Sequence, residues 1–205
     1  MLQFSPEKDS PASLYKLMIG MVVPRPIAFV SSLDAQGVHN LAPFSYFMAC
    51  SADPPVICFS AGRRSGPHPV KDTLANILAT KEFVVNIVSE EFAEKMNLTS
   101  AEVPPEVDEF KIASLTPLAS DLVKPHRVAE SRAHMECRLR QTLPIHNASG
   151  EISSTIVFGD VLRFHLDEAI VKDYKIDPVK LRAIGRMGGP SYIYTHDLFE
   201  MTRPK

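Results

Sequence analysis

Residues Pro26–Cys50, PIAFVSSLDAQGVHNLAPFSYFMAC, carry the clearest signal for the fold class of this chain. The first eight residues are mostly apolar, with β-branched and aromatic side chains, and predict a strand over residues 26–33. The tetrapeptide Asp34–Gly37 is typical of a hairpin turn. Residues 38–50 predict a second strand, interrupted at Pro43 because proline has no N–H to donate to a sheet. The stretch therefore predicts strands joined by tight turns.

The rest of the chain continues this pattern of short strands, with small helices between them. Further strands are predicted over residues 55–61, 82–88, 129–145 and 151–167, with a hairpin turn at 147–150. Helices are predicted over residues 11–20, with Ser10 as the N-cap, and over 72–80, 90–98 and 177–184. Residues 101–110 and 185–192 are expected to be loops. Strand and helix do not alternate regularly, so a doubly wound sheet is not expected. A closed antiparallel barrel fits better, because closure removes exposed sheet edges. We therefore predict a mainly β fold of about six strands with helical insertions.

Composition bounds the class of protein. The 205 residues are enough for one domain with a sizeable core, which we expect to span residues 1–205. A 45% hydrophobic and 22% charged composition is typical of a soluble globular protein. No apolar run approaches a membrane span, and the N-terminus lacks a signal segment, so the sequence predicts a cytoplasmic protein with no membrane partner. A net charge of -2, a pI near 6.4 and the absence of Trp argue against a nucleic-acid surface.

Cysteine and histidine spacing points away from metal chemistry. The three cysteines, Cys50, Cys58 and Cys137, are widely spaced and predict reduced, separate thiols. The sequence has neither a CxxC nor an HExxH pattern, so no metal ligand is predicted.

The segment FSAGRRSGPHPVKDT, residues 59–73, concentrates cations at a strand-to-helix junction. Arg63, Arg64 and Lys71 stand among Gly62, Ser65 and Gly66, ahead of a helix that begins at Asp72 and Thr73. Glycines let backbone N–H groups approach an anion, the helix N-terminus is partly positive, and arginine offers a planar fork for phosphate oxygens. This arrangement suits a single phosphate group. A solvated loop with a helix cap at Asp72 is an equally good interpretation of the pattern alone.

Residues 40–55, NLAPFSYFMACSADPP, form a second unusual cluster. Asn40, Pro43, Ser45 and Ser51 interrupt an apolar and aromatic run. Apolar faces with a few polar groups suit a flat heteroaromatic ring. An irregular core strand with a bulge explains the same pattern.

No constellation of general acid–base or nucleophilic groups is evident. Ser31 and Ser32 end a predicted strand, but no His and Asp are placed to form a triad with them. Chemistry carried by a bound cofactor requires positioning more than protein acid–base groups, so this pattern leaves cofactor chemistry open.

Taken in order, these segments resemble the flavin reductase-like, FMN-binding split-barrel family. The resemblance runs from about Val22 to Tyr194 and rests on residues 22–88 together with IGRMGGPSYIYT, residues 184–195. The family implies a six-stranded antiparallel split barrel with helical insertions. It also implies a homodimer with FMN sites at or near the subunit interface.

The resemblance also implies which residues lie near FMN. Those implied along the isoalloxazine ring and ribityl chain are Asn40, Ala42, Pro43, Phe44, Ser45, Ala49, Cys50 and Ser51, with Ser31 and Ser32 nearby. Those implied toward the phosphate are Ser60, Arg63, Arg64, Lys71, Asp72 and Thr73. The loop over residues 186–192, including Tyr192, is implied to lie near the pocket. No catalytic residue is assigned.

The family leaves several functions open. The first interpretation is an FMN-dependent oxidoreductase that takes hydride from NADH or NADPH and passes electrons to a small-molecule flavin or another acceptor. The second is a flavoredoxin-type carrier that exchanges electrons with a protein partner without using nicotinamide. The third is a relative of the pyridoxamine-phosphate oxidases, against which the segments APFSYF and GRRSG argue. A fold and a cofactor do not by themselves name a substrate.

Overall fold

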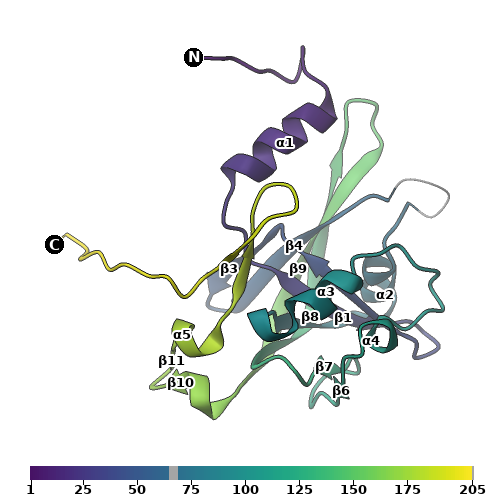
Figure 1. Cartoon of the computed structure of the whole chain (residues 1–205). Coiled ribbons are helices and arrows are strands. Elements are labelled where there is room, and N and C mark those ends of the chain that lie inside the picture. Colours follow the sequence, from purple (N-terminus) through teal and green to yellow (C-terminus); the bar gives the residue numbers. More distant parts are fainter. Residues whose placement is uncertain (65–68, 205) are drawn as a thin grey trace.

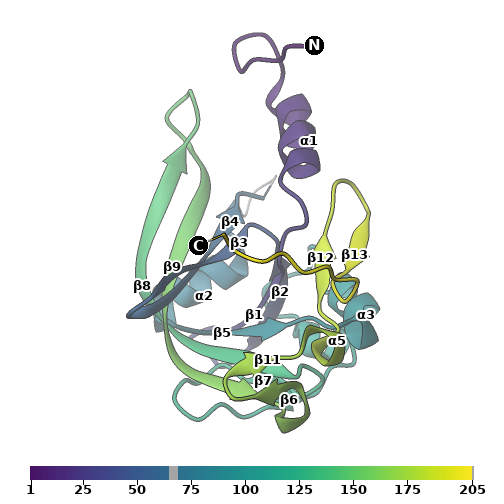
Figure 2. The ribbon, with the colours of Figure 1, turned by 90° about the vertical axis from the view of Figure 1, so that its left-hand side faces the viewer.

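The computed structural model describes residues 1–64 and 69–204 and is built around one antiparallel sheet (Figures 1 and 2). The sheet has seven strands in the order β2-β1-β5-β8-β9-β4-β3. Its strands are β1 (Ala28–Leu33), β2 (His39–Phe44), β3 (Phe47–Ala52), β4 (Pro55–Gly62), β5 (Glu82–Ile87), β8 (Ala133–His146) and β9 (Ile152–Leu166). Two-stranded pairs are formed by β6 (Pro117–Leu118) with β7 (Arg127–Val128), β10 (Val171–Lys172) with β11 (Lys175–Ile176), and β12 (Ile184–Arg186) with β13 (Tyr192–Tyr194).

Short helices fill the connections, as the sequence predicts. They are α1 (Pro11–Met21), α2 (Asp72–Thr80), α3 (Ala93–Leu98), α4 (Glu109–Ile112) and α5 (Pro178–Leu181), with 3₁₀ turns η1 (Glu90–Phe92) and η2 (Glu168–Ile170). The predicted cap of α1 is confirmed, because the Ser13 N–H donates to Ser10 Oγ at 3.2 Å. The predicted bounds of α2 are also confirmed.

The prediction of one strand over residues 38–50 is wrong. The chain leaves the sheet at Ser45 and Tyr46 and forms two strands, β2 and β3, which pair with β1 and β4 respectively. These strands stand at opposite ends of the strand order, so the main sheet has seven strands rather than six. Pro43 does not interrupt β2, because β2 is an edge strand and tolerates the missing N–H.

The sheet curls around an aromatic core that brings its two ends together. The ring centroids of Phe44, on β2, and Phe59, on β4, lie 4.8 Å apart, and Phe83 on β5 lies 5.8 Å from Phe59. The Ser60 N–H donates to the Tyr46 carbonyl at 2.9 Å, which ties the β2–β3 connection to β4. In the residues described, the edge strands β2 and β3 are joined by the chain itself and not by a hydrogen-bonded ladder.

The C-terminal region also differs from prediction. The helix expected over residues 177–184 ends at Leu181, because Arg182 adopts a left-handed conformation with φ 52°. Ile184 instead pairs with Tyr194, so the expected loop over 185–192 forms parts of β12 and β13 and, at residues 187–191, the turn that joins them. The loop expected over residues 101–110 ends where α4 begins at Glu109.

The β8–β9 hairpin extends well beyond the rest of the sheet, and α1 stands across from it (Figure 2). Its turn at residues 147–150 matches the prediction, with Gly150 at φ 81°. Leu143, Ile145 and Ile152 leave 40–49% of their surface exposed along this extension. The extension and α1 flank the outer face of β3 and β4.

Candidate functional site

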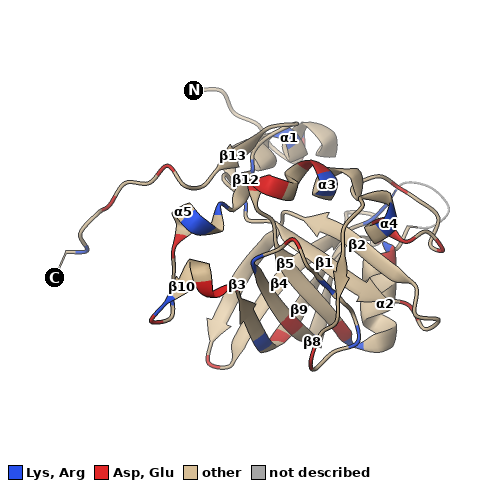
Figure 3. Ribbon diagram, turned by 60° about the horizontal axis from the view of Figure 1, so that its bottom comes forward, with Lys and Arg blue, Asp and Glu red and all other residues tan. Residues whose placement is uncertain are grey.

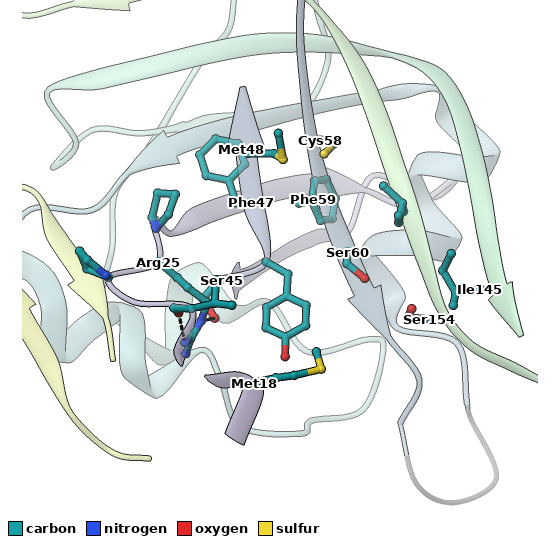
Figure 4. A pocket seen from close by; sticks show the side chains of 15 residues that line it. Met18, Arg25, Ser45, Phe47, Met48, Cys58, Phe59, Ser60, Ile145 and Ser154 are labelled. Carbon is teal, nitrogen blue, oxygen red and sulfur yellow. Dashed lines mark hydrogen bonds between the residues drawn. The ribbon is translucent and has the colours of Figure 1, made fainter. Parts of the chain in front are cut away.

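A cavity of about 500 Å³ lies between α1, the β3–β4 pair and the β8–β9 extension (Figure 4). In the close-up, Arg25 and Ser45 lie at one side, and Ser60, Ser154 and Ile145 lie at the opposite side. Its lining residues are Met18, Val22, Pro24, Arg25, Pro26, Ser45, Tyr46, Phe47, Met48, Cys58, Phe59, Ser60, Ile145, Ser154 and Ile156. A mostly apolar wall with a few hydroxyls suits a flat aromatic ligand with polar edges.

Strand alternation explains how β4 builds the cavity floor. Ile57, Phe59 and Ala61 are buried in the core, whereas Cys58 and Ser60 point to the other face of the strand. The cavity therefore lies on the outer face of the curled sheet.

A second cavity of about 400 Å³ shares the wall formed by Arg25 and Ser45. Pro43 and Tyr192 line this smaller space. The Tyr192 hydroxyl contacts Asn97 Oδ1 at 3.4 Å, and its ring stacks against the Arg186 guanidinium at 4.4 Å. The β12–β13 hairpin thus closes one side of the second cavity.

The cations expected to hold a phosphate gather at the end of β4. Arg64 pairs with Asp72 at 2.8 Å, and Arg64 Nε is buried without a hydrogen-bond partner among the described residues. Burial lowers the pKa of Lys71, and the neighbouring Arg64 lowers it further. Arg63 lies more exposed and 3.7 Å from Glu151. Ser65 and Gly66, also part of the predicted cradle, lie outside the residues described.

The cation cluster adjoins the first cavity along β4. Ser60 lines the cavity, and Arg63 follows three residues later in the chain. A strand rises about 3.3 Å per residue, so the two positions are separated by about 10 Å. One extended ligand with an apolar ring and a distant anionic group could therefore contact both.

Three predicted residues, Asn40, Ser32 and Thr73, form a buried polar network instead of lining either cavity, and Ser31 is buried in separate hydrogen bonds. Asn40 Oδ1 accepts hydrogen bonds from Thr73 Oγ1 at 2.6 Å and from Ser32 Oγ at 3.3 Å. Ser31 Oγ donates to the His126 carbonyl at 2.6 Å. Ser31 and Ser32 have no exposed surface. We infer that these side chains fix the relative position of β1, β2 and α2 behind the site.

Glu109 anchors this network from α4. Its carboxylate accepts from Asn40 Nδ2 at 2.8 Å and from the Leu41 N–H at 3.0 Å. Burial raises the Glu109 pKa, and these hydrogen bonds lower it, with a net upward shift.

The remaining predicted residues lie at the margins. Phe44 is a core residue, and Ala42 packs against the same core. Ala49, Cys50 and Ser51 are exposed on β3, where the pairing with β4 shifts by one residue between Ala49 and Ser51. The bulge that the sequence allowed is therefore present, but it lies on β3 and not at Pro43 on β2.

Several cavity residues were not predicted from the sequence. Arg25 precedes β1, Tyr46, Phe47 and Met48 follow Ser45, and Met18 comes from α1. Arg25 had one usable signal, a cation isolated among prolines in PRP, residues 24–26. No local sequence signal marks the cavity residues of α1 and β9, since only folding brings these two elements to the cavity.

The first cavity offers little proton-transfer chemistry at neutral pH. Its titratable lining residues, within the described chain, are Arg25, Tyr46 and Cys58. Burial raises the pKa of Cys58 to about 12, helped by a hydrogen bond with Cys50, and burial also raises the pKa of Tyr46. Such a site favours reactions that need positioning over reactions that need a general base.

Elsewhere, Asp121, Glu136 and His165 place ligand-type atoms within 4.8 Å of one another. Glu136 already accepts from the N–H groups of Asp121 and Leu122, and Asp121 pairs with Arg163 at 2.6 Å. We infer that this cluster has a structural role, which is to hold the 117–131 segment against β8 and β9.

In the ribbon of Figure 3, basic and acidic residues are interspersed along the described chain. Within the described part of the chain, no helix combines the length and apolarity that crossing a membrane requires.

Comparison with known proteins identifies the class to which this fold and site belong. The model of the flavin reductase like domain matches residues 20–179. The structure of nitrilotriacetate monooxygenase component B from Bacillus cereus is 35% identical, with a TM-score of 0.94 and 98% of each chain covered. The 2-nitrobenzoate 2-nitroreductase of Pseudomonas fluorescens is 28% identical, with a TM-score of 0.87 over 99% of this chain and 96% of the other. An uncharacterised protein of Aquifex aeolicus is 40% identical over 94% of this chain and 95% of its own.

The chain therefore belongs to the flavin reductase-like family. Membership implies a flavin cofactor and oxidoreductase chemistry. The described residues fit such a cofactor, since an apolar cavity with hydroxyls at its edges adjoins a cation cluster in which a buried arginine nitrogen lacks a partner.

Proposed function

We propose that this protein is an FMN-dependent oxidoreductase that uses NADH or NADPH as electron donor and passes the electrons to a flavin or another small acceptor. The observation that carries the proposal is the apolar cavity adjoining the Arg64–Lys71–Asp72 cluster along β4. In this proposal the flavin ring occupies the apolar cavity, and the terminal phosphate binds at the Arg64–Lys71–Asp72 cluster.

In this proposal the cation cluster selects FMN over riboflavin. Arg64 and Lys71 supply charge, and the first-turn N–H groups of α2 add donors that have no partner within the helix. Asp72 holds the Arg64 guanidinium in place. Charge-assisted hydrogen bonds to phosphate are the stronger kind, so this end of the site supplies much of the affinity.

The apolar cavity would orient the ring and exclude water. When bound, the flavin would supply the hydride-accepting chemistry, with reduced nicotinamide as the hydride donor. Met48, Phe47 and Ile156 offer apolar surface, while Ser45 and Ser60 offer hydroxyls for ring edges. No lining residue has to take up a proton, which agrees with the pKa directions of Cys58 and Tyr46.

We further propose that a second copy of the chain covers the cavity. Large apolar side chains stay exposed around its rim, with Met18 at 53%, Val22 at 61% and Met48 at 57%. A monomer rarely leaves such a patch uncovered, and two-fold dimers are the commonest soluble assembly. The expected result of sedimentation at micromolar concentration is a homodimer. A monomer that binds FMN tightly would contradict the shared site.

Anaerobic stopped-flow absorbance tests the reaction. The FMN-loaded protein is mixed with NADH or NADPH, and the flavin absorbance should fall at a rate that saturates with donor concentration. Dithionite serves as the control for reducible flavin. If dithionite reduces the flavin while neither nucleotide does, the nicotinamide-linked proposal fails and a flavoredoxin-type electron carrier takes its place.

A further inference from the structure

Arg25 is a buried cation in the wall between the two cavities, with only 5% of its surface exposed. One terminal nitrogen donates to the carbonyls of Ile19 at 2.7 Å and Val22 at 2.9 Å, and the other donates to the Met187 carbonyl at 2.9 Å. Nε contacts Ser45 Oγ at 3.4 Å. These bonds hold the guanidinium in a fixed position between α1, β2 and the β12–β13 hairpin.

The positive charge of Arg25 has no carboxylate partner within 4.0 Å in the described part of the chain. Other arginines, including the more exposed Arg140 and Arg163, do pair with aspartates. Burying an unpaired charge is costly, and carbonyl dipoles offset only part of that cost. The site therefore carries surplus positive potential in a weakly screened environment.

Ser45 links the Arg25 guanidinium to both cavities. Its oxygen is the acceptor for Arg25 Nε, so its own hydrogen is free to donate toward a ligand. Ser45 and Arg25 both line each of the two cavities. Figure 4 shows Arg25 and Ser45 side by side at the first cavity. A ring bound in either cavity would lie beside the same fixed donor and charge.

We propose that Arg25 and Ser45 recognise negative charge delocalised over the ligand's ring, and thereby hold reduced FMN more tightly than oxidised FMN. The proposal rests on the FMN binding proposed above. Two-electron reduction adds electron density to the ring and makes a ring nitrogen acidic, so the reduced form is the more negative one. A preorganised charge of low exposure favours this form without needing to move.

The test measures affinity for both redox states of the flavin. Oxidised FMN is titrated by fluorescence, and the potential of the bound flavin is measured against redox dyes with dithionite as reductant, without nicotinamide. The wild-type protein should bind reduced FMN at least tenfold more tightly than oxidised FMN, which raises the two-electron potential by about 30 mV over free FMN. Equal affinity, or tighter binding of oxidised FMN, overturns the proposal.

Variants separate charge from structure. Arg25→Gln should lower the preference for the reduced form about tenfold, Arg25→Lys should retain most of it, and Ser45→Ala should lower it by a smaller factor. The Arg25→Gln effect should be the same with riboflavin, because the charge acts on the ring. If Arg25→Gln weakens both redox states equally, Arg25 is only structural.

If Arg25→Gln does not fold, the redox preference of the wild type and of the Ser45→Ala and Arg25→Lys variants still tests the proposal. The redox preference is measured with dithionite, so it is independent of whether nicotinamide reduces the flavin. A protein that shows the preference but ignores NADH and NADPH contradicts only the proposed donor. A protein that binds neither redox state of flavin overturns both proposals.

Discussion

Arg64 and Asp72 lie 2.8 Å apart, joining the end of β4 to the first turn of α2. Both side chains are about 15% exposed, so this pair is less screened by solvent than a surface ion pair. The carboxylate fixes the guanidinium but occupies only part of its donor fork. Nε has no hydrogen-bond partner among the described residues, so we expect the remaining donors of the fork to be available to a second anion.

Arg64→Ala should weaken FMN binding roughly ten- to a hundredfold while leaving riboflavin binding nearly unchanged. Losing a charge-assisted hydrogen bond costs about 1.5–3 kcal/mol, and only FMN carries the phosphate that would make it. Fluorescence titration with both ligands measures the difference. Arg163→Ala on β9 is the matched control, because the Arg163–Asp121 pair that it removes lines neither cavity, and it should affect the binding of neither ligand. Equal losses for FMN and riboflavin would contradict the phosphate assignment.

Gly159→Ala should destabilise the fold by about 1–3 kcal/mol. A Cβ at this position on β9 would lie 2.4 Å from the Phe83 ring and 3.4 Å from the Cys137 Cβ, inside the aromatic core. Urea unfolding measures the loss. Gly20→Ala in α1 is the matched control, because a Cβ there meets nothing within 4 Å, and it should be neutral or slightly stabilising. A neutral Gly159→Ala variant would mean that the core is looser than the aromatic packing indicates.

Local sequence patterns predicted most elements of the fold because those patterns are set by near neighbours. Ser10 and Pro11 start a helix, residues 147–150 form a hairpin turn, and the apolar run from Glu82 forms β5. The break at Ser45 and Tyr46 was not predicted, since it depends on which distant strand each half pairs with. Pro43 was the stronger local signal, yet an edge position makes a proline harmless.

The candidate site was predictable only in part, for the same reason. The cation cluster is contiguous in sequence, and the structure does bring Arg64, Lys71 and Asp72 together. The cavity draws on α1, β3, β4 and β9, and no local pattern links these elements. Ser31, Ser32 and Thr73 have the polarity expected of ligand contacts, but burial directs their hydroxyls to protein groups.

The three cysteines should react in a fixed order with a disulfide reagent. Cys50 is exposed and should react first. Cys58 should react more slowly, because burial raises its pKa to about 12, and Cys137 should react only on unfolding, because complete burial raises its pKa above the ordinary range. Peptide mapping by mass spectrometry assigns each site.

The same labelling reports on the cavity. Cys58 lines it and Cys50 does not, so saturating FMN should slow labelling of Cys58 and leave Cys50 unchanged. A Cys50→Ser variant removes the fast thiol and shows the Cys58 phase alone. If FMN protects neither thiol, the ring does not occupy this cavity. Labelling of folded Cys137 at the rate of Cys50 would contradict the described core.

His134 should make the fold sensitive to acid. Its Nε2 lies 2.8 Å from the Val128 carbonyl, and Nδ1 is buried with no partner among the described residues. Burial lowers the pKa of His134 from 6.5 to about 4. Between these two values the unfolded chain binds a proton that the folded chain does not, so stability rises with pH and is lost as pH falls below 6.5.

The expected contribution of His134 between pH 7 and pH 5 is roughly 2 kcal/mol, since each unit of pKa difference corresponds to about 1.4 kcal/mol. His134→Gln keeps a side-chain N–H donor for Val128 and cannot titrate, so its urea midpoint should fall less than that of the wild type over this range. His146→Gln, at the exposed end of β8, is the matched control and should follow the wild type. Groups distant from both positions contribute equally to all three proteins, so the difference between them reports on His134 and its charged neighbours Arg127, Glu136 and His165. If His134→Gln and the wild type lose the same stability on acidification, the imidazole is not held neutral in the folded state.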